Sequence, residues 1–159
     1  MTVALGCRLT MRRGVCSVVI TGSRCYPGND ARATRFTIAA MYSAELLDHF
    51  EHPRNAGELE QPDATAEVTN PACGDTLRLT LRVEDGRVAE IRFLAKGCVP
   101  AMACGSALTG LVRGKTLGEA ARLTREDVAS AVGGLPEASG HAGYLAIDAL
   151  SSALEQVQG

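Results

Sequence analysis

The stretch NPACGD, residues 70–75, places a thiol beside a carboxylate in a turn. Pro71 and Gly74 bend the chain there, so Cys73 and Asp75 are expected in a loop just before a strand rather than in a core. A cysteine thiolate binds zinc and iron, and a carboxylate oxygen is a harder ligand for the same ions. The stretch therefore makes Cys73 and Asp75 candidate metal ligands.

Two further candidate ligands come at the starts of expected helices. Cys98 follows Gly97 and lies just ahead of a helix that includes Pro100, and His141 follows Gly140 in the first turn of the last helix. Unpaired N–H groups at a helix N-terminus favour thiolate over thiol, the form of cysteine that binds metal. Cysteine and histidine suit zinc or iron, and thiolates in particular suit iron–sulfur clusters.

The spacing of these residues leaves other interpretations open. The chain has no Cys-x-x-Cys pair, so the pattern is not that of a zinc finger. Two partly buried cysteines and a surface histidine would need no metal at all. Cys98 as nucleophile, His141 as base and Asp75 as the orienting acid would make an enzyme, but no local motif of a known hydrolase accompanies them. His49, on the first expected helix, and His52, before a proline, are expected to be solvated.

Three strands are expected to form one sheet. After a short helix capped by Ser43, residues 64–69 are typical of a weak strand. In TLRLTLRV, residues 76–83, leucine and valine alternate with threonine and arginine, which marks a strand with one buried face. Asp85-Gly86 is a strong two-residue hairpin signal. The return strand is expected to turn Ala89, Ile91, Phe93 and Ala95 to one face, and Glu90 and Arg92 to the other.

The rest of the chain is predicted to be helical. A helix that includes Pro100 should reach about Arg113, and TLGE (116–119) and TRED (124–127) resemble the capping sequences of two short helices. After Ser139 the last helix presents one apolar side, formed by Ala142, Leu145, Ala146, Ala149, Leu150, Ala153, Leu154 and Val157. The order of elements predicts an α+β fold in which helices pack on a three-stranded antiparallel sheet.

The composition argues against nucleic acid and membranes as binding partners. The chain has 159 residues and a net charge of −2, which divides into +5 for residues 1–40 and −7 for the remainder. An acidic body with 4% aromatic residues and no tryptophan argues against a nucleic-acid surface. No apolar run approaches the length of a membrane span, so no membrane partner is expected.

Residues 1–40 are expected to lie outside the fold. They are rich in arginine and contain a single acidic residue, as in an organelle transit peptide, but a well-patterned helix begins directly after Met41. The preferred interpretation is an unstructured extension, or upstream sequence translated by mistake, followed by one domain at 41–159. The three cysteines of the extension, Cys7, Cys16 and Cys25, are then expected to carry no function.

The segment from about Tyr42 to Val157 resembles the U-type iron–sulfur cluster assembly scaffolds, the family of IscU and of the N-terminal domain of NifU. The resemblance rests on HFEHPRNAGEL, NPACGD, LAKGCVPAMACGSALTGLVRGKTLGEA and GHAGYLAIDAL. It implies the same α+β fold and a role as a cytoplasmic scaffold, or one of an organelle matrix if the extension is a transit peptide. It also implies that the protein is not an enzyme.

Carried over by position, the resemblance implies that Cys73, Asp75, Cys98 and His141 bind a transient [2Fe–2S] cluster. The sulfur would come from a cysteine desulfurase, and the cluster would pass to acceptor apo-proteins. Such scaffolds have His-Cys where this chain has His141-Ala142, so the family's third cysteine is missing. Cys104 is the available substitute, although an offset of six residues on a straight helix points it away from Cys98. A homodimer that shares one cluster through two thiolates from each subunit would also supply four sulfur ligands.

The differences between this chain and the family pattern have two more consequences. With one family ligand lost, the same four residues could instead hold a single zinc or iron ion in a regulatory metal-binding module. Scaffolds served by a dedicated Hsp70 chaperone carry LPPVK, whereas this chain reads LPEAS at 135–139. The resemblance therefore does not extend to recognition by that chaperone.

Overall fold

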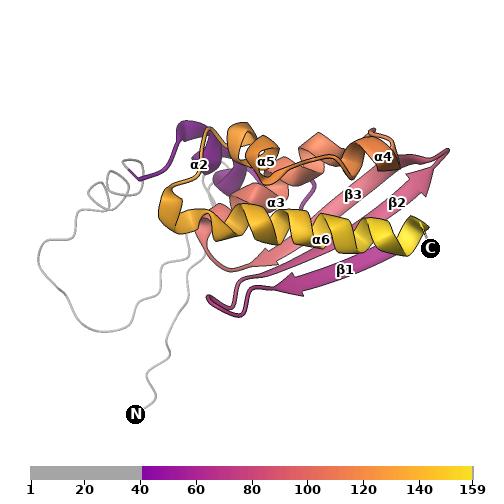
Figure 1. Ribbon diagram of the computed structural model, residues 1–159, viewed down its shortest axis with the longest axis horizontal. Helices are drawn as coiled ribbons and strands as arrows, with labels where there is room; N and C mark the ends of the chain where they lie inside the picture. Colours follow the sequence, from indigo (N-terminus) through magenta and orange to yellow (C-terminus); the bar gives the residue numbers. More distant parts are fainter. Residues whose placement is uncertain (1–40, 159) are drawn as a thin grey trace, which may run out of the picture. The chain divides into compact units, whose positions relative to one another are not determined.

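The computed structural model describes residues 41–158, and there three strands form one antiparallel sheet in the order β1-β2-β3 (Figure 1). The strands are β1 (Ala64–Thr69), β2 (Thr76–Glu84) and β3 (Arg87–Lys96). Two long helices, α3 (Val99–Val112) and α6 (His141–Gln158), pack on the sheet, as Figure 1 shows. The predicted α+β fold is confirmed. The predictions for residues 1–40 lie outside the described residues.

The hairpin between β2 and β3 forms as its turn sequence predicts. Asp85 and Gly86 both have positive φ angles, 52° and 72°, which is the conformation of a type I′ turn. Along β2, the predicted alternation places Leu77, Leu79 and Leu81 in the core with at most 1% of their surface exposed.

A β-bulge makes one prediction for β3 wrong. Arg82 pairs with Glu90 but the next residue, Val83, pairs with Val88, so Ala89 is an extra residue in the ladder. The bulge changes the alternation on its far side, and Val88 is buried there in place of Ala89. The predicted inward positions of Ile91 and Phe93 are correct, at 1% and 2% exposure.

Helix α3 lies close to the sheet because it has a glycine at the contact. A methyl group on Gly105 would lie 2.7 Å from Cδ2 of Phe93 and 3.0 Å from Cδ1 of Leu77. Helix α6 covers β1 and β2 with the apolar side predicted for it, of which Ala146, Ala149 and Ala153 are fully buried. These two contacts fix where the N-terminal ends of α3 and α6 lie.

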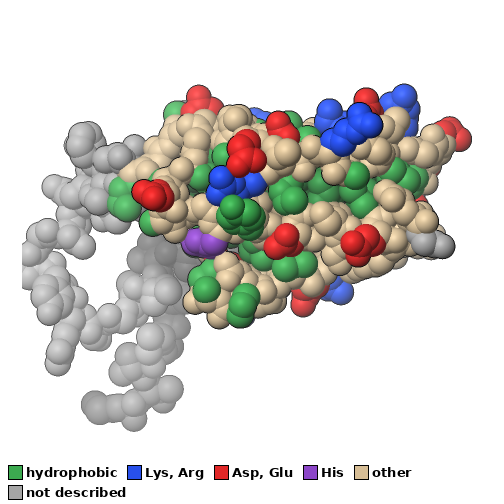
Figure 2. Space-filling model, in the orientation of Figure 1, with side chains coloured by type: hydrophobic (Ala, Val, Ile, Leu, Met, Phe, Trp, Pro, Cys, Tyr) green, Lys and Arg blue, Asp and Glu red, His purple; other side chains and the backbone are tan. Residues whose placement is uncertain are grey.

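Shorter helices complete the described fold. They are α2 (Ala44–Glu51), α4 (Leu117–Ala120) and α5 (Arg125–Ala131), followed by a 3-10 turn at Glu137–Ser139. Ser43 caps α2, and both predicted capping boxes, at Thr116 and Thr124, are present. Among the described helices, none has the length and apolar composition needed to cross a membrane. On Figure 2, acidic and basic side chains are interspersed over the face that is drawn.

The prediction that His49 is solvated is wrong. His49 is 5% exposed, and its Nδ1 lies 2.9 Å from the hydroxyl of Ser106 in α3. The signal was present in the sequence, because His49 follows Leu46 by three residues and so shares the buried side of α2. His52 is exposed as predicted and lies 3.4 Å from Asp48.

Candidate metal centre

Four predicted ligands from three separate segments meet at one end of the sheet. One donor atom from each of Cys73, Asp75 and His141 can be chosen so that all lie within 4.8 Å of one another. Cys98 completes the group, since its Sγ is 3.0 Å from Oδ2 of Asp75 and 4.0 Å from Nε2 of His141. The structure therefore brings together the four residues that the sequence singled out.

The NPACGD turn exposes one of its two donors and buries the other. Asn70 closes the turn: its side-chain oxygen accepts the N–H of Ala72 at 2.9 Å, and its backbone oxygen accepts that of Gly74 at 2.8 Å. Gly74 has a φ of 75°, a conformation that favours glycine. As a result Cys73 is exposed at the tip of the turn, whereas Asp75, directly before β2, is only 5% exposed.

Asp75 is the side chain around which the group is arranged. Its carboxylate accepts the backbone N–H of Cys98 at 3.2 Å as well as the thiol, and Oδ2 lies 3.6 Å from Nε2 of His141. Burial alone would raise the pKa of Asp75, but hydrogen bonds from Cys98 and Cys73, together with the nearby His141, bring it below its ordinary value. The carboxylate is therefore ionised at neutral pH.

The expectation that the start of α3 favours a Cys98 thiolate is wrong for the site without an ion. Cys98 is the N-cap residue of α3, but burial and then the hydrogen bond to Asp75 raise the pKa of its thiol to about 11. The backbone N–H of Ala101 acts in the opposite direction and is outweighed. A bound cation would change this balance, because a coordinating thiol is deprotonated.

The structure keeps Cys104 out of the group. It is fully buried in the core, and burial raises the pKa of its thiol to about 12. Ala142, at the position of the family's third cysteine, is also buried, with 1% of its surface exposed. The described residues therefore supply two sulfur donors to the site, from Cys73 and Cys98, with one imidazole and one carboxylate.

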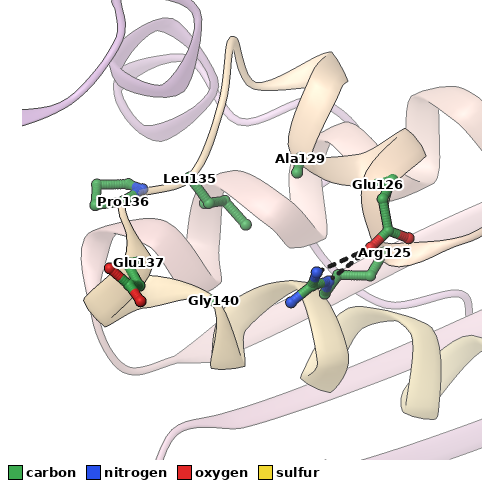
Figure 3. Close-up of a pocket in the computed structure, with 7 residues that line it drawn as sticks. All are labelled: Arg125, Glu126, Ala129, Leu135, Pro136, Glu137 and Gly140. Carbon is green, nitrogen blue, oxygen red and sulfur yellow. Dashed lines mark hydrogen bonds and ion pairs between the residues drawn. The ribbon is translucent and has the colours of Figure 1, made fainter.

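The start of α6, and with it His141, is held by α5. A methyl group on Gly143 would lie 2.7 Å from Cγ of Arg125, so the arginine crosses α6 where that helix has no side chain. Its guanidinium carbon lies 4.7 Å from the centre of the Tyr144 ring and its nitrogens bond Glu126. Figure 3 shows Arg125 and Glu126 on one side of a small pocket, and Leu135 and Pro136 on the segment that leads to α6.

Comparisons with known proteins show which family this chain resembles. The model of the family described as NifU-like N terminal domain matches residues 41–159. The iron–sulfur cluster assembly scaffold protein IscU 1 of Archaeoglobus fulgidus is 44% identical over 114 residues, which cover 72% of this chain and 74% of that protein. The nitrogen fixation protein NifU of Cereibacter sphaeroides is 49% identical over 117 residues, which cover 74% of this chain and 48% of that protein.

The fold is also found among solved structures. The N-terminal NifU-like protein from Brucella abortus superposes with a TM-score of 0.62 and 25% sequence identity, over 76% of this chain and 96% of that one. The family model and the scaffold proteins match most of the described residues in sequence. The solved structure matches them in fold. The chain therefore belongs to the family of NifU-like N-terminal domains.

Proposed function

We propose that the protein is a scaffold on which an iron–sulfur cluster is assembled and from which the cluster passes to acceptor proteins. The observation that carries the proposal is the convergence of two thiols, an imidazole and an ionised carboxylate from three segments of the chain. Thiolates are the usual ligands of iron–sulfur clusters, and histidine replaces cysteine at some cluster irons. Relatives named as cluster assembly scaffolds support the same role.

The arrangement suits a cluster that is held and then released. Cys73 is exposed at a turn, so a cluster bound there can be reached by another protein. Asp75 offers iron a hard oxygen ligand, which holds the metal less firmly than a third thiolate would. The cluster is the cargo of the protein rather than a resident cofactor, and the role is that of a carrier rather than an enzyme.

The cluster type and the partners belong to the same proposal. We propose a [2Fe–2S] cluster, a cysteine desulfurase as sulfur donor, apo-proteins as acceptors and a cytoplasmic location. A homodimer that shares one cluster stays a prediction. Leu135 packs against the core and Glu137–Ser139 form a 3-10 turn, so LPEAS is not a free extended segment, and we propose no dedicated Hsp70 chaperone for it.

The alternative of a regulatory module with a single ion is less well supported. Cys73, Cys98, His141 and Asp75 could hold one zinc ion in a tetrahedral site. The relatives that match most of the described residues, however, are named as scaffolds of cluster assembly. The relatives therefore favour a cluster over a lone ion.

Anaerobic reconstitution with ferrous iron and sulfide tests the proposal. We expect visible charge-transfer absorption and about two irons per bound cluster. Cys73→Ser and Cys98→Ser should abolish the absorption. Cys104→Ala is the matched control and should retain it, because this thiol lies in the core. A colourless protein with one bound zinc would support the single-ion module instead.

The missing third cysteine calls for a separate comparison. Ala142→Cys restores the His-Cys pair of the family, but the natural chain already offers four donors. We therefore expect the natural chain and the variant to hold the same amounts of iron and sulfide in analyses of anaerobically purified protein. If only the variant holds a cluster, the natural chain is a degenerate relative and the scaffold proposal is wrong.

A further inference from the structure

A glycine beside the metal centre leaves the space that its carboxylate occupies. Gly97 immediately precedes Cys98, and a methyl group on its Cα would overlap Oδ1 of Asp75 and lie 2.5 Å from Cγ and 2.8 Å from Cβ. Carbon atoms in folded proteins do not approach this closely, so one of the two side chains would have to move. The side chain of Asp75 therefore lies directly against the backbone at residue 97.

This contact explains how the carboxylate reaches both donor groups of the following residue. Oδ1 of Asp75 accepts the backbone N–H of Cys98 at 3.2 Å, and Oδ2 accepts its thiol at 3.0 Å. A carboxylate that is 5% exposed and bound on both oxygens has little room to shift. Any side chain at residue 97 would push it away from the N–H that it now accepts.

We propose that Gly97 is a positioning residue that sets Asp75 in its place in the metal centre. Other close-packed glycines of the described chain leave room for structural side chains: Gly105 for Phe93, and Gly143 for Arg125. Among the described glycines, Gly97 is the one whose free space is filled by a candidate ligand. The test that follows the lifetime of the cluster rests on the proposed function. The test that follows hydrogen exchange rests on geometry alone.

The first experiment measures the lifetime of the reconstituted cluster in Gly97→Ala, in Asp75→Ala and in the double variant. Both single changes remove the carboxylate from the site, so both should change the lifetime in the same direction and by a similar factor. In the double variant the second change should alter the lifetime by less than a factor of about two, the spread expected when no further interaction is lost. The double variant is informative because a general loosening of the site by Gly97→Ala would add to the effect of Asp75→Ala.

Two glycines of α3 provide matched controls. Gly110→Ala adds the same methyl group to the same helix where nothing lies within 4 Å, and should leave the lifetime unchanged. Gly105→Ala forces a methyl group against Phe93 and Leu77 without touching the site. It should lower the melting temperature of the protein without changing the lifetime of the cluster. A changed lifetime in Gly105→Ala would show that a general loss of packing explains the effect.

A second experiment needs no metal. Hydrogen exchange of the Cys98 amide in the full-length, metal-free protein reports the hydrogen bond to Asp75. Protection of this amide should fall in Gly97→Ala and in Asp75→Ala, and should persist in Gly110→Ala. If Gly97→Ala does not fold, the variant that also carries Asp75→Gly decides the matter, because Asp75→Gly removes all three atoms that the methyl group meets. Recovery of folding supports the inference. No recovery overturns it, because the positive φ of Gly97, 158°, and not the space for Asp75 would then be the reason that the position needs glycine.

The outcomes separate this inference from the proposed function. If the natural chain forms no cluster, the scaffold proposal fails, while exchange at Cys98 still decides the role of Gly97. If the cluster forms and Asp75→Ala changes its lifetime, but Gly97→Ala matches the natural chain in lifetime and in amide protection, the positioning role is wrong and the scaffold proposal stands.

Discussion

At the residue scale, Asp75 is the side chain that links the other residues of the site. It is nearly buried, it is ionised, and it contacts both Cys98 and His141. It holds a proton on the Cys98 thiol through a hydrogen bond as long as no ion is bound. In the proposed scaffold, the same oxygens would turn to the entering iron and the thiol would release its proton to solvent. A single carboxylate would thus serve both the empty site and the loaded one.

Asp75→Cys should lengthen the lifetime of a bound cluster. The change replaces the hard oxygen ligand with a third thiolate, which holds iron more firmly. Decay of the visible absorption, followed after dilution into buffer with a chelator, measures the effect. Asp148→Ala, which removes an exposed carboxylate about two turns after His141 on α6, is the control. Equal decay in the Asp75 variant and the natural chain would contradict the role given to Asp75.

The residues that meet at the candidate site could be selected from the sequence, but the protonation state of Cys98 could not be predicted. Residue types at the turn and at two helix starts were enough to select Cys73, Cys98 and His141. The expected Cys98 thiolate depended on the local helix end alone. The opposing influence comes from Asp75, which is distant in sequence and adjacent only in the folded chain. Burial of Cys104 was likewise set by packing on the sheet.

At the scale of elements, α2 is fastened to α3 through an imidazole. Ser106 of α3 lies between Nδ1 of His49 and the backbone N–H of Arg54, at 2.9 Å and 2.8 Å. Burial, and then the charge of Arg54, lower the pKa of His49, while Asp48 acts in the opposite direction. Protonation of His49 would therefore weaken the contact between the two helices.

Acidification should reduce the free energy of unfolding through His49. Above the unfolded value of about 6.5 the imidazole is neutral in both states and contributes nothing to the pH dependence. As the pH falls below that value the unfolded chain takes up a proton that the folded chain does not, so stability decreases until the lowered folded pKa is reached. Denaturant melts at about pH 7.5 and 5.5 measure the difference.

His49→Gln should remove part of this pH dependence, and His52→Gln should not. Glutamine at residue 49 can still accept from Ser106 but does not titrate. His52 is exposed, so its replacement is the matched control. A pH dependence that is unchanged in His49→Gln would show that other groups carry it.

The contact between α3 and the sheet has its own test. Gly105→Ala should lower the free energy of unfolding by about 1–3 kcal/mol, the usual cost of an extra carbon in a filled core. The methyl group would press on Phe93 and Leu77, both of which are buried. Chemical denaturation measures the change. Gly110→Ala has open space around it and should instead stabilise by up to about 1 kcal/mol, because alanine is the better helix former.

Elements with a strong local signal were predictable, and irregularities that depend on pairing were not. The hairpin at Asp85-Gly86 and the capping boxes at Thr116 and Thr124 are encoded within four residues. The bulge at Ala89 has no such signal, because it exists only when β3 is aligned against β2. The role of Gly97 has no local signal either, because Asp75, whose side chain fills the space at Gly97, lies on another segment.

At the scale of the whole molecule, the candidate site joins three parts of the chain that are far apart in sequence. The turn before β2, the start of α3 and the start of α6 each contribute donors. An ion bound there would tie the sheet to both long helices. Binding to the folded chain alone must then stabilise the fold, because the unfolded chain lacks the assembled site.

Zinc should therefore raise the melting temperature of the full-length protein. Free zinc at about a hundredfold excess over its dissociation constant adds about 2.7 kcal/mol to the free energy of unfolding. At about 4 °C for each kcal/mol, the melting temperature should rise by roughly 10 °C. Thermal unfolding followed by circular dichroism, with and without zinc, measures the shift. Cys98→Ser should lose most of it, because the ion then lacks one of its thiolates.

The three cysteines of residues 1–40 could also bind zinc, so the measurement is repeated with Cys7, Cys16 and Cys25 changed to serine. The shift should persist in that background, because the site at 73, 75, 98 and 141 is intact. It should disappear when Cys73→Ser is added. A shift that is lost with the first three changes, or kept after the last, would place the ion outside the site at the end of the sheet. In that event the convergence of Cys73 and Cys98 would have no part in binding zinc.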